Sequence, residues 1–147
     1  MARSIGVSNF SAKHLADIIE DSGVTPAVNQ IEMHPRFIQA DMRAMHARLG
    51  ILTQAWSPLG EGNAPFGEPA VTGAAAAHGV TPAQVILRWH IQLGAVPLPK
   101  SATLSRQRDN LDVFGFTLSD AEEAAITALA WADGRLFGDD PDTHEEM

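Results

Sequence analysis

The chain has 147 residues, 45% hydrophobic and 19% charged, which is typical of a globular protein with a core and excludes a wholly disordered chain. Its net charge of −8 argues against a nucleic-acid-binding surface, and the absence of Cys excludes disulfides, thiolate chemistry and Cys-based metal sites. The sequence has no apolar stretch approaching about 18 residues and no secretion signal, so we expect a cytoplasmic protein that does not enter membranes.

Strand-like and helix-like segments alternate along the chain. Strands are predicted over residues 4–7, 26–32, 51–57 and 95–100, the first and last of them buried. Helices are predicted over residues 12–22, 39–49, 70–78, 82–93, 105–114 and 120–130. Ser11, Thr81 and Ser119 stand where a helix N-cap is expected, and Gly23 and Gly50 lie just beyond two helix ends.

Three of these helices carry apolar residues at spacings that place them on one helical face, which in the second helix is predicted to point inward. The residues are Leu15, Ile18 and Ile19 in the first, Met42, Met45 and Leu49 in the second, and Leu104, Leu111 and Phe114 in the fifth. A loop rich in Gly and Pro, over residues 60–69, follows the third strand, and loops of this kind often cover functional sites.

Strands that alternate with helices imply a parallel sheet, either an open doubly wound sheet or part of a (βα)8 barrel. The turn after the first strand lacks the G-x-G-x-x-G pattern of dinucleotide-binding sheets. Instead, polar or aromatic residues recur at the carboxyl ends of the strands: Ser8, Asn9, Gln30, Trp56, Ser57, Lys100 and Ser101. In a barrel these ends converge on one face and form the active site, which favours the barrel.

The segment AVPLPKSATLSRQRDN, residues 95–110, places cations at an unusual position. Lys100, Arg106 and Arg108 follow a strand and lie near the start of a helix, whereas cations generally favour the other end of a helix. Helix N-terminal N–H groups together with cations make a site for a phosphate. A solvated basic turn explains this segment equally well.

Five motifs in collinear order resemble the aldo-keto reductase family: GVSNF from Gly6, NQIEMHP from Asn29, WSPLG from Trp56, AQVILRWHIQLG from Ala83 and PLPKSATLSRQRDNLDVFGFTLS from Pro97. The resemblance implies part of a (βα)8 TIM barrel, in which four βα units resemble strands five to eight and are followed by C-terminal helices. Residues 1–137 would form this C-terminal half, and residues 138–147 an acidic tail.

The resemblance also implies a site for NADP(H). Ser8, Asn9 and Gln30 match residues that hydrogen-bond the nicotinamide carboxamide, and Trp56 matches an aromatic residue that stacks on its ring. The remaining matches are Ser57 and Leu59 along the pyrophosphate, Lys100, Ser101 and Arg106 at the 2′-phosphate, and Asp109 and Asn110 near the adenine. Asp109 stands where the family commonly has Glu.

The four catalytic residues of the family, an Asp, a Tyr, a Lys and a His, would lie in the other half, and this chain contains no Tyr. No residue here is therefore nominated as catalytic, and no metal site is predicted. His34, before a Pro, is predicted to be a structural turn residue, and Glu32 either an acid–base group or a support for the site.

Three functions follow from this resemblance. The chain is the cofactor-binding half of an NADP(H)-dependent carbonyl reductase and inactive alone, a non-catalytic NADP(H)-binding module, or a structural half-barrel. A half-barrel leaves strand edges and one sheet face open, so we expect a homodimer or assembly with a complementary half. A small carbonyl substrate is expected only when the barrel is complete, and neither nucleic acid nor membrane is expected as a partner.

Overall fold

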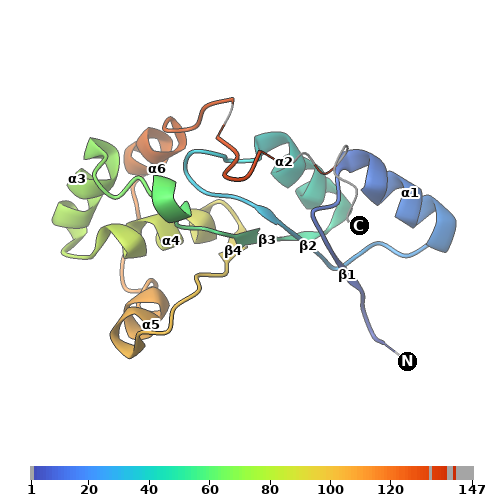
Figure 1. Cartoon of the computed structure of the whole chain (residues 1–147), viewed down its shortest axis with the longest axis horizontal. Coiled ribbons are helices and arrows are strands. Elements are labelled where there is room, and N and C mark those ends of the chain that lie inside the picture. Colours follow the sequence, from blue (N-terminus) through green and yellow to red (C-terminus); the bar gives the residue numbers. More distant parts are fainter. Residues whose placement is uncertain (1, 133, 139–140, 142–147) are drawn as a thin grey trace.

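A computed structural model describes residues 2–132, 134–138 and 141 of the chain. Its sheet has four parallel strands in the order β1 (Gly6–Ser8), β2 (Val28–Glu32), β3 (Leu52–Trp56) and β4 (Ala95–Pro97) (Figure 1). Each strand pairs in parallel with the next strand in sequence, as in successive βα units. The predicted parallel α/β architecture is therefore confirmed.

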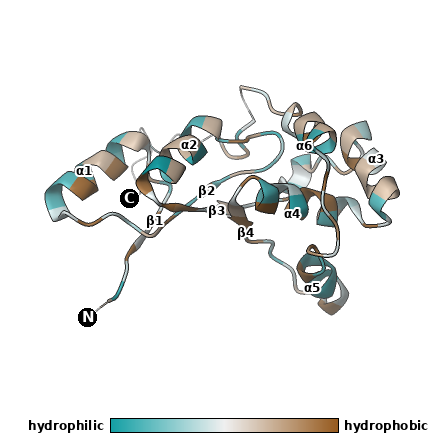
Figure 2. Cartoon of the chain, turned by 180° about the vertical axis from the view of Figure 1, so that it is seen from behind, coloured by the Kyte–Doolittle hydropathy of each residue, from teal (hydrophilic) through white to brown (hydrophobic). Residues whose placement is uncertain are grey.

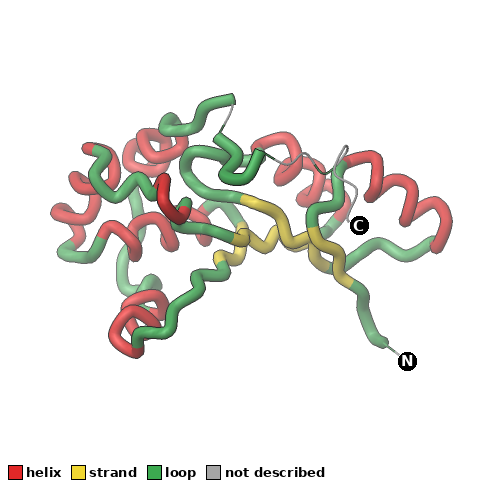
Figure 3. Tube along the Cα trace, viewed as in Figure 1, coloured by secondary structure: helices red, strands yellow, loops and turns green. Residues whose placement is uncertain are grey.

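Helices follow the strands in the predicted order. They are α1 (Ala12–Ser22), α2 (Ala40–Leu49), the 3₁₀ turn η1 (Glu61–Asn63), α3 (Pro69–His78), α4 (Pro82–Gln92), α5 (Leu104–Leu111) and α6 (Asp120–Thr127). Figure 3 shows α1 and α2 beside one end of the strand region and α3, α4 and α6 beside the other. None of the described helices is both long and apolar enough to cross a membrane.

The helix boundaries follow from local chemistry that the sequence already contains. Ser11, Thr81 and Ser119 each cap a helix, and in all three cases the side chain at the third helical position bonds back to the cap residue. Gly23 and Gly50 end α1 and α2 with φ near 70°, a left-handed conformation that glycine adopts without steric cost. These predicted caps are confirmed.

The two faces of the sheet differ in exposure. Side chains on the face toward the helices are buried, namely Asn29, Ile31, Thr53, Ala55 and Ala95. Most of the alternate residues are half-buried or exposed, among them Ser8, Gln30, Gln54 and Val96, which stand level with one another across the four strands. Glu32, the last residue of β2, is the buried exception. Among the described residues, the helices thus cover one face of the sheet and leave the other largely open.

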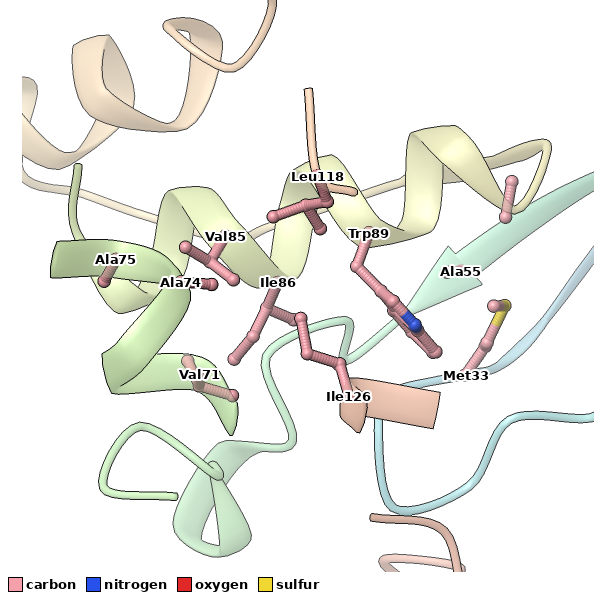
Figure 4. Packing of buried hydrophobic residues seen from close by; sticks show 11 residues of the cluster. Met33, Ala55, Val71, Ala74, Ala75, Val85, Ile86, Trp89, Leu118 and Ile126 are labelled. Atoms are coloured by element: carbon pink, nitrogen blue, oxygen red, sulfur yellow. The ribbon is translucent and has the colours of Figure 1, made fainter. Parts of the chain in front are cut away.

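The hydrophobic core lies between β3, β4 and the helices of the second half of the chain. It contains Met33, Ala55, Val71, Ala74, Ala75, Val85, Ile86, Trp89, Ala95, Leu118 and Ile126. Figure 4 shows Ile86 and Trp89 extending from α4 into this cluster. The indole N–H of Trp89 donates to the hydroxyl of Thr127 at 3.0 Å, so α4 and α6 are joined by both packing and a hydrogen bond.

Two buried histidines connect the sheet to its helices. The ring nitrogens of His46 lie 2.8 Å from the Thr53 hydroxyl and 3.1 Å from the Asn29 amide. The ring of His90 lies between the carbonyls of Ile86 and Met33, at 2.8 and 3.1 Å. Burial lowers the pKa of both rings, that of His90 to about 4, so both are neutral near pH 7.

Several sequence-based predictions are wrong in detail. The first strand begins at Gly6 rather than at residue 4 and is not buried, because it lies at the open edge of the sheet. The last strand stops at Pro97, and Val96 within it is 39% exposed. In α2 the fully buried side chain is His46, while Leu49, predicted to point inward, is 38% exposed.

The largest difference concerns α5. Its apolar residues Leu104, Leu111 and the following Phe114, which are predicted to share one helical face, are 61%, 76% and 71% exposed. None of the residues of α5 is buried. Figures 1 and 2 show α5 standing apart from the other helices, below α4. The predicted apolar face is therefore mainly exposed in the described part of the chain.

Candidate functional site

The carboxyl end of the sheet brings together two site residues that lie far apart in sequence. The indole N–H of Trp56, at the end of β3, donates to the side-chain oxygen of Asn9, after β1, at 2.8 Å. Asn9 has a φ of 56°, a left-handed conformation that Asn tolerates better than most residues. This hydrogen bond fixes the orientation of the indole ring and leaves the amide nitrogen of Asn9 available to a ligand.

Ser8 and Gln30 lie beside this pair on the open face of the sheet. The Ser8 hydroxyl donates to the backbone carbonyl of Gln30 at 3.3 Å, and the Gln30 amide donates to Gln54 on β3 at 3.3 Å. Because the Gln30 amide nitrogen is engaged in this way, its oxygen is oriented and can accept a further hydrogen bond. The chain thus presents both a donor and an acceptor at this end of the sheet.

Ser57 and Leu59 begin the loop after β3. Ser57 has a φ of 46°, an uncommon left-handed conformation for a residue other than Gly, and its hydroxyl donates to Glu61 at 2.8 Å. Strained backbone of this kind costs of order 1 kcal/mol or more and clusters at functional sites. Leu59, by contrast, packs against the hydrophobic core and anchors the loop.

The segment after α6 lies over the same end of the sheet. Phe137 stacks on Trp56 with ring centroids 6.0 Å apart, and the Leu136 N–H donates to the Glu32 carboxylate at 2.6 Å. Gly134 lies so close to the Arg36 carbonyl that any added Cβ would clash with it. This segment therefore has a defined position next to the candidate ring-binding residues.

Glu32 and His34 contact each other, and Glu32 holds the segment after α6 through Leu136. Both are buried, and the Nε2 atom of His34 lies 3.0 Å from the Glu32 carboxylate that also accepts from Leu136. His34 also forms a two-residue turn with Phe37 through backbone hydrogen bonds in both directions. The predicted turn role of His34 is confirmed, and of the two roles weighed for Glu32 these contacts favour support.

The second group of predicted residues surrounds the start of α5. Lys100 and Ser101 follow β4, and the Ser101 hydroxyl accepts from the Thr103 N–H at 3.2 Å. Gln107 donates to the Ser101 carbonyl at 2.8 Å and so ties this turn to the helix. Thr103 is the N-cap residue of α5, but its side chain makes no capping bond, so the first N–H groups remain open to an anion.

The cations in this region have no carboxylate partners among the described residues. The salt bridges between described residues involve Lys13, His34, Arg36 and His78, which lie elsewhere in the chain, and none involves Lys100, Arg106 or Arg108. Arg106 and Asp109 are exposed on α5, and Asn110 is half-buried on it. The donor set of Lys100, Ser101 and Arg106 therefore fits a phosphate in chemistry and in availability.

A groove of about 830 Å³ lies under α5. It is bounded by α5, β4 and the end of α4, and its lining is mainly apolar, with Val96, Leu111 and Phe114 among its residues. Ser101 and Asn110, from the predicted adenosine end of the site, also line it. The groove thus adjoins the cationic group and does not reach Trp56.

Hydrogen bonds join Ser8, Asn9, Gln30 and Trp56 in one group. Lys100, Ser101, Arg106, Asp109 and Asn110 are close in sequence around the start of α5, where the Gln107–Ser101 hydrogen bond ties the turn to the helix, and Ser57 and Leu59 lie between the two groups in the chain. Sequence reasoning missed Gln54, Glu61 and Phe137, which contact site residues directly. The spacing of four between Ser57 and Glu61 is the one local signal that could have indicated any of them. No group of three potential metal ligands occurs among the described residues.

Comparison with known proteins identifies relatives along nearly the whole chain. The model of the Aldo/keto reductase family matches residues 1–66 and 68–130. The 2,5-diketo-D-gluconic acid reductase B of Corynebacterium sp. is 53% identical over all 147 residues, which cover 52% of that protein. An aldo-keto reductase of Mycolicibacterium smegmatis is 52% identical over 96% of this chain and 50% of its own.

Solved structures are similar to this chain as well. A mutant of Gox0644 in complex with NADPH superposes with a TM-score of 0.91 at 44% identity, over 98% of this chain and 52% of that one. The Bombyx mori aldo-keto reductase in complex with NADP gives a TM-score of 0.82 at 36% identity, over 88% and 45%. The chain spans about half the length of the relatives it matches. On the family match and on these similarities, the chain belongs to the aldo-keto reductase family.

Proposed function

We propose that this chain is the cofactor-binding half of an NADP(H)-dependent aldo-keto reductase, corresponding to strands five to eight of the barrel. It would interconvert a carbonyl and an alcohol only together with the rest of the barrel. The observation that carries the proposal is the Asn9–Trp56 hydrogen bond, because it holds an aromatic ring and a free amide at the carboxyl ends of parallel strands. NADP(H) is the cofactor that the relatives support.

At the nicotinamide end, each residue has a separate task. Trp56 offers a ring face, and stacking on it contributes of order 1 kcal/mol beyond burial. Ser8, Asn9 and Gln30 offer hydroxyl and amide groups for the carboxamide, which needs both donors and acceptors. When bound, the reduced cofactor supplies the hydride for a carbonyl carbon, and the residues of this chain hold and orient it.

At the adenosine end, charge determines which dinucleotide binds. Lys100 and Arg106, free of carboxylate partners among the described residues, would pair with a 2′-phosphate, and Ser101 and the open N–H groups of α5 would add hydrogen bonds. Hydrogen bonds to charged groups contribute roughly 1.5–3 kcal/mol each. Two such contacts account for a preference for NADP(H) over NAD(H). Asp109 and Asn110 would lie near the adenine.

We assign no catalytic residue to this chain. Proton transfer to the developing alkoxide requires an acid within hydrogen-bond reach of it, and loss of such an acid lowers rates roughly 10²–10⁴-fold. Glu32 and His34 are buried and occupied with each other and with Leu136, which makes them supports for the segment above. The chain alone should therefore bind cofactor without turnover.

The test is a titration of the 147-residue chain with NADPH, followed by quenching of Trp fluorescence, with NADH as the comparison. We expect NADPH to bind more tightly, and Lys100→Ala to weaken NADPH by about tenfold or more while leaving NADH unchanged. The Trp56→Phe variant shows how much of the fluorescence quenching comes from Trp56 and how much from the other two tryptophans. Equal affinities for both nucleotides, unaffected by Lys100→Ala, would refute the phosphate site, and turnover by the chain alone would refute its catalytic incompleteness.

A further inference from the structure

The side chain of Ser57 is already engaged within the chain itself. Its hydroxyl donates to the Glu61 carboxylate at 2.8 Å, four residues further along the loop after β3. A turn brings the two side chains together, because the Gly60 N–H donates to the Ser57 carbonyl at 2.9 Å and Glu61, like Ser57, has a φ of 46°. The backbone thus holds a carboxylate next to a residue of the predicted cofactor site.

The Glu61 carboxylate has no cation to neutralise it in the described part of the chain. The salt bridges between described residues use other carboxylates, those of Asp17, Glu32, Glu68 and Glu122. The Glu61 side chain is exposed, and its hydrogen bond among the described residues is the one to Ser57. It can therefore turn into solvent without breaking any other described side-chain contact of this kind.

The hydrogen bond to Glu61 and a hydrogen bond to a pyrophosphate exclude each other. A Ser hydroxyl carries one hydrogen and donates one hydrogen bond at a time. The family resemblance places the pyrophosphate of the cofactor along Ser57, and the oxygens of an ionised pyrophosphate only accept hydrogen bonds. Ser57 must therefore release Glu61 before it can donate to the pyrophosphate. The Glu61 carboxylate then remains nearby and repels the bound anion, because like charges a few ångströms apart repel each other even in water.

We propose that Glu61 is a specificity-determining residue of the cofactor site, which competes with the pyrophosphate for the Ser57 hydroxyl and repels it by charge. The inference rests on the function proposed above. Glu61 lowers the affinity for every ligand that binds through a pyrophosphate, and Lys100 and Arg106 compensate only for a ligand that also carries a 2′-phosphate. NADPH is thus retained, whereas NADH is bound weakly.

The effects of Glu61 and Lys100 depend on different groups of the ligand. The effect of Glu61 follows the pyrophosphate, and the effect of Lys100 follows the 2′-phosphate. NADPH carries both groups, NADH carries the pyrophosphate without the 2′-phosphate, and adenosine 2′-monophosphate carries the 2′-phosphate without the pyrophosphate. These three ligands therefore separate the two effects.

The experiment is a calorimetric titration of the 147-residue chain with each of the three ligands. Glu61→Gln removes the charge and keeps an oxygen to which the Ser57 hydroxyl can still donate. We expect this variant to tighten NADPH and NADH by the same factor, about fivefold, and to leave adenosine 2′-monophosphate unchanged. Lys100→Ala should instead weaken NADPH and adenosine 2′-monophosphate and leave NADH unchanged.

Glu20→Gln is the matched control for net charge. Glu20 is exposed on α1 and belongs to none of the salt bridges between described residues, so its substitution removes one negative charge from the same total of −8. We expect Glu20→Gln to leave all three dissociation constants unchanged. A gain in dinucleotide affinity as large as that of Glu61→Gln would mean that the overall charge of the chain is the cause, and would overturn the inference.

The remaining outcomes separate this inference from the proposed function. Dinucleotide binding that Glu61→Gln leaves unchanged or weakens would overturn the inference and make Glu61 a support that orders the loop. An equal gain for adenosine 2′-monophosphate would also overturn it, because that ligand has no pyrophosphate. In both cases the proposed function stands if Lys100→Ala still weakens NADPH. Absence of dinucleotide binding to the chain and to both Glu variants would refute the proposed cofactor site and this inference with it.

Discussion

His90 is the residue at which burial and charge are most directly opposed. Its ring is completely buried and lies between two carbonyl groups, which favour the protonated ring because each can accept an N–H hydrogen bond. Burial nevertheless lowers the pKa of His90 from the ordinary 6.5 to about 4. The cost of removing a cation from water thus outweighs the gain from two acceptors. The folded protein holds this ring neutral at pH values where the unfolded chain takes up a proton.

This difference predicts an acid-dependent loss of stability. Because the unfolded state binds more protons between pH 6.5 and about 4, the free energy of unfolding should fall as the pH decreases through that window. The contribution of His90 amounts to about 3 kcal/mol across it. Urea denaturation at a series of pH values measures this, with His90→Gln, which cannot titrate, as the comparison. If wild type and variant lose stability in parallel between pH 6.5 and 4, His90 is not the cause.

At the scale of elements, α4 depends on chemistry at its first turn. The Thr81 hydroxyl accepts from the Gln84 N–H at 3.3 Å, and the Gln84 side chain accepts from the Thr81 N–H at 3.0 Å. The Gln84 amide also donates to the Asp112 carbonyl at 2.7 Å, which joins the start of α4 to the chain after α5. The capping interaction between Thr81 and Gln84 therefore orders both the first turn of α4 and the residues that follow α5.

Thr81→Ala should lower the free energy of unfolding by about 1 kcal/mol, because it leaves an N–H group at the start of α4 without its partner. Thr72→Ala is the matched control, since the Thr72 hydroxyl bonds only to carbonyls of its own helix region and Ala favours helix. Thermal unfolding of both variants measures the difference. A loss for Thr72→Ala as large as that for Thr81→Ala would mean that the cap contributes nothing.

The elements also show what the sequence could predict. Caps such as Ser11 and Thr81 act within one turn of helix, so their chemistry is local and the predictions hold. Burial of the apolar face of α5 would require a neighbouring element. Helical periodicity shows which residues share a face, but not what packs against that face. The Phe137–Trp56 stack joins residues separated by most of the chain, and no local pattern precedes it. The family motifs predicted a set of site residues, but not contacts such as that between Ser57 and Glu61.

In the whole molecule, buried contacts are unevenly distributed. The core cluster joins β3, α3, α4 and α6, whereas β1 pairs on one side only and α5 buries no residue. Stability should follow the same distribution, because regions with few buried contacts open at low cost while the core opens only on global unfolding. Four of the eleven residues of the predicted cofactor site, Ser8, Arg106, Asp109 and Asn110, lie in β1 or α5.

Amide hydrogen exchange measures this distribution. We expect α4 and β3 to exchange slowest, and β1 and α5 to exchange much faster at neutral pH. Uniform protection across α4 and α5 in the lone chain would contradict this account.

The two prolines at the edge of β4 have a consequence for solubility. An exposed strand with a full set of donors and acceptors accepts almost any extended chain, and stacking of this kind leads to fibres. Pro97 and Pro99 have no N–H, so an incoming strand finds fewer hydrogen-bond donors there than on an ordinary strand edge. An edge of this kind pairs weakly with an arbitrary extended chain, which lowers the risk of aggregation. It can still pair with a strand whose apolar side chains add contacts of their own.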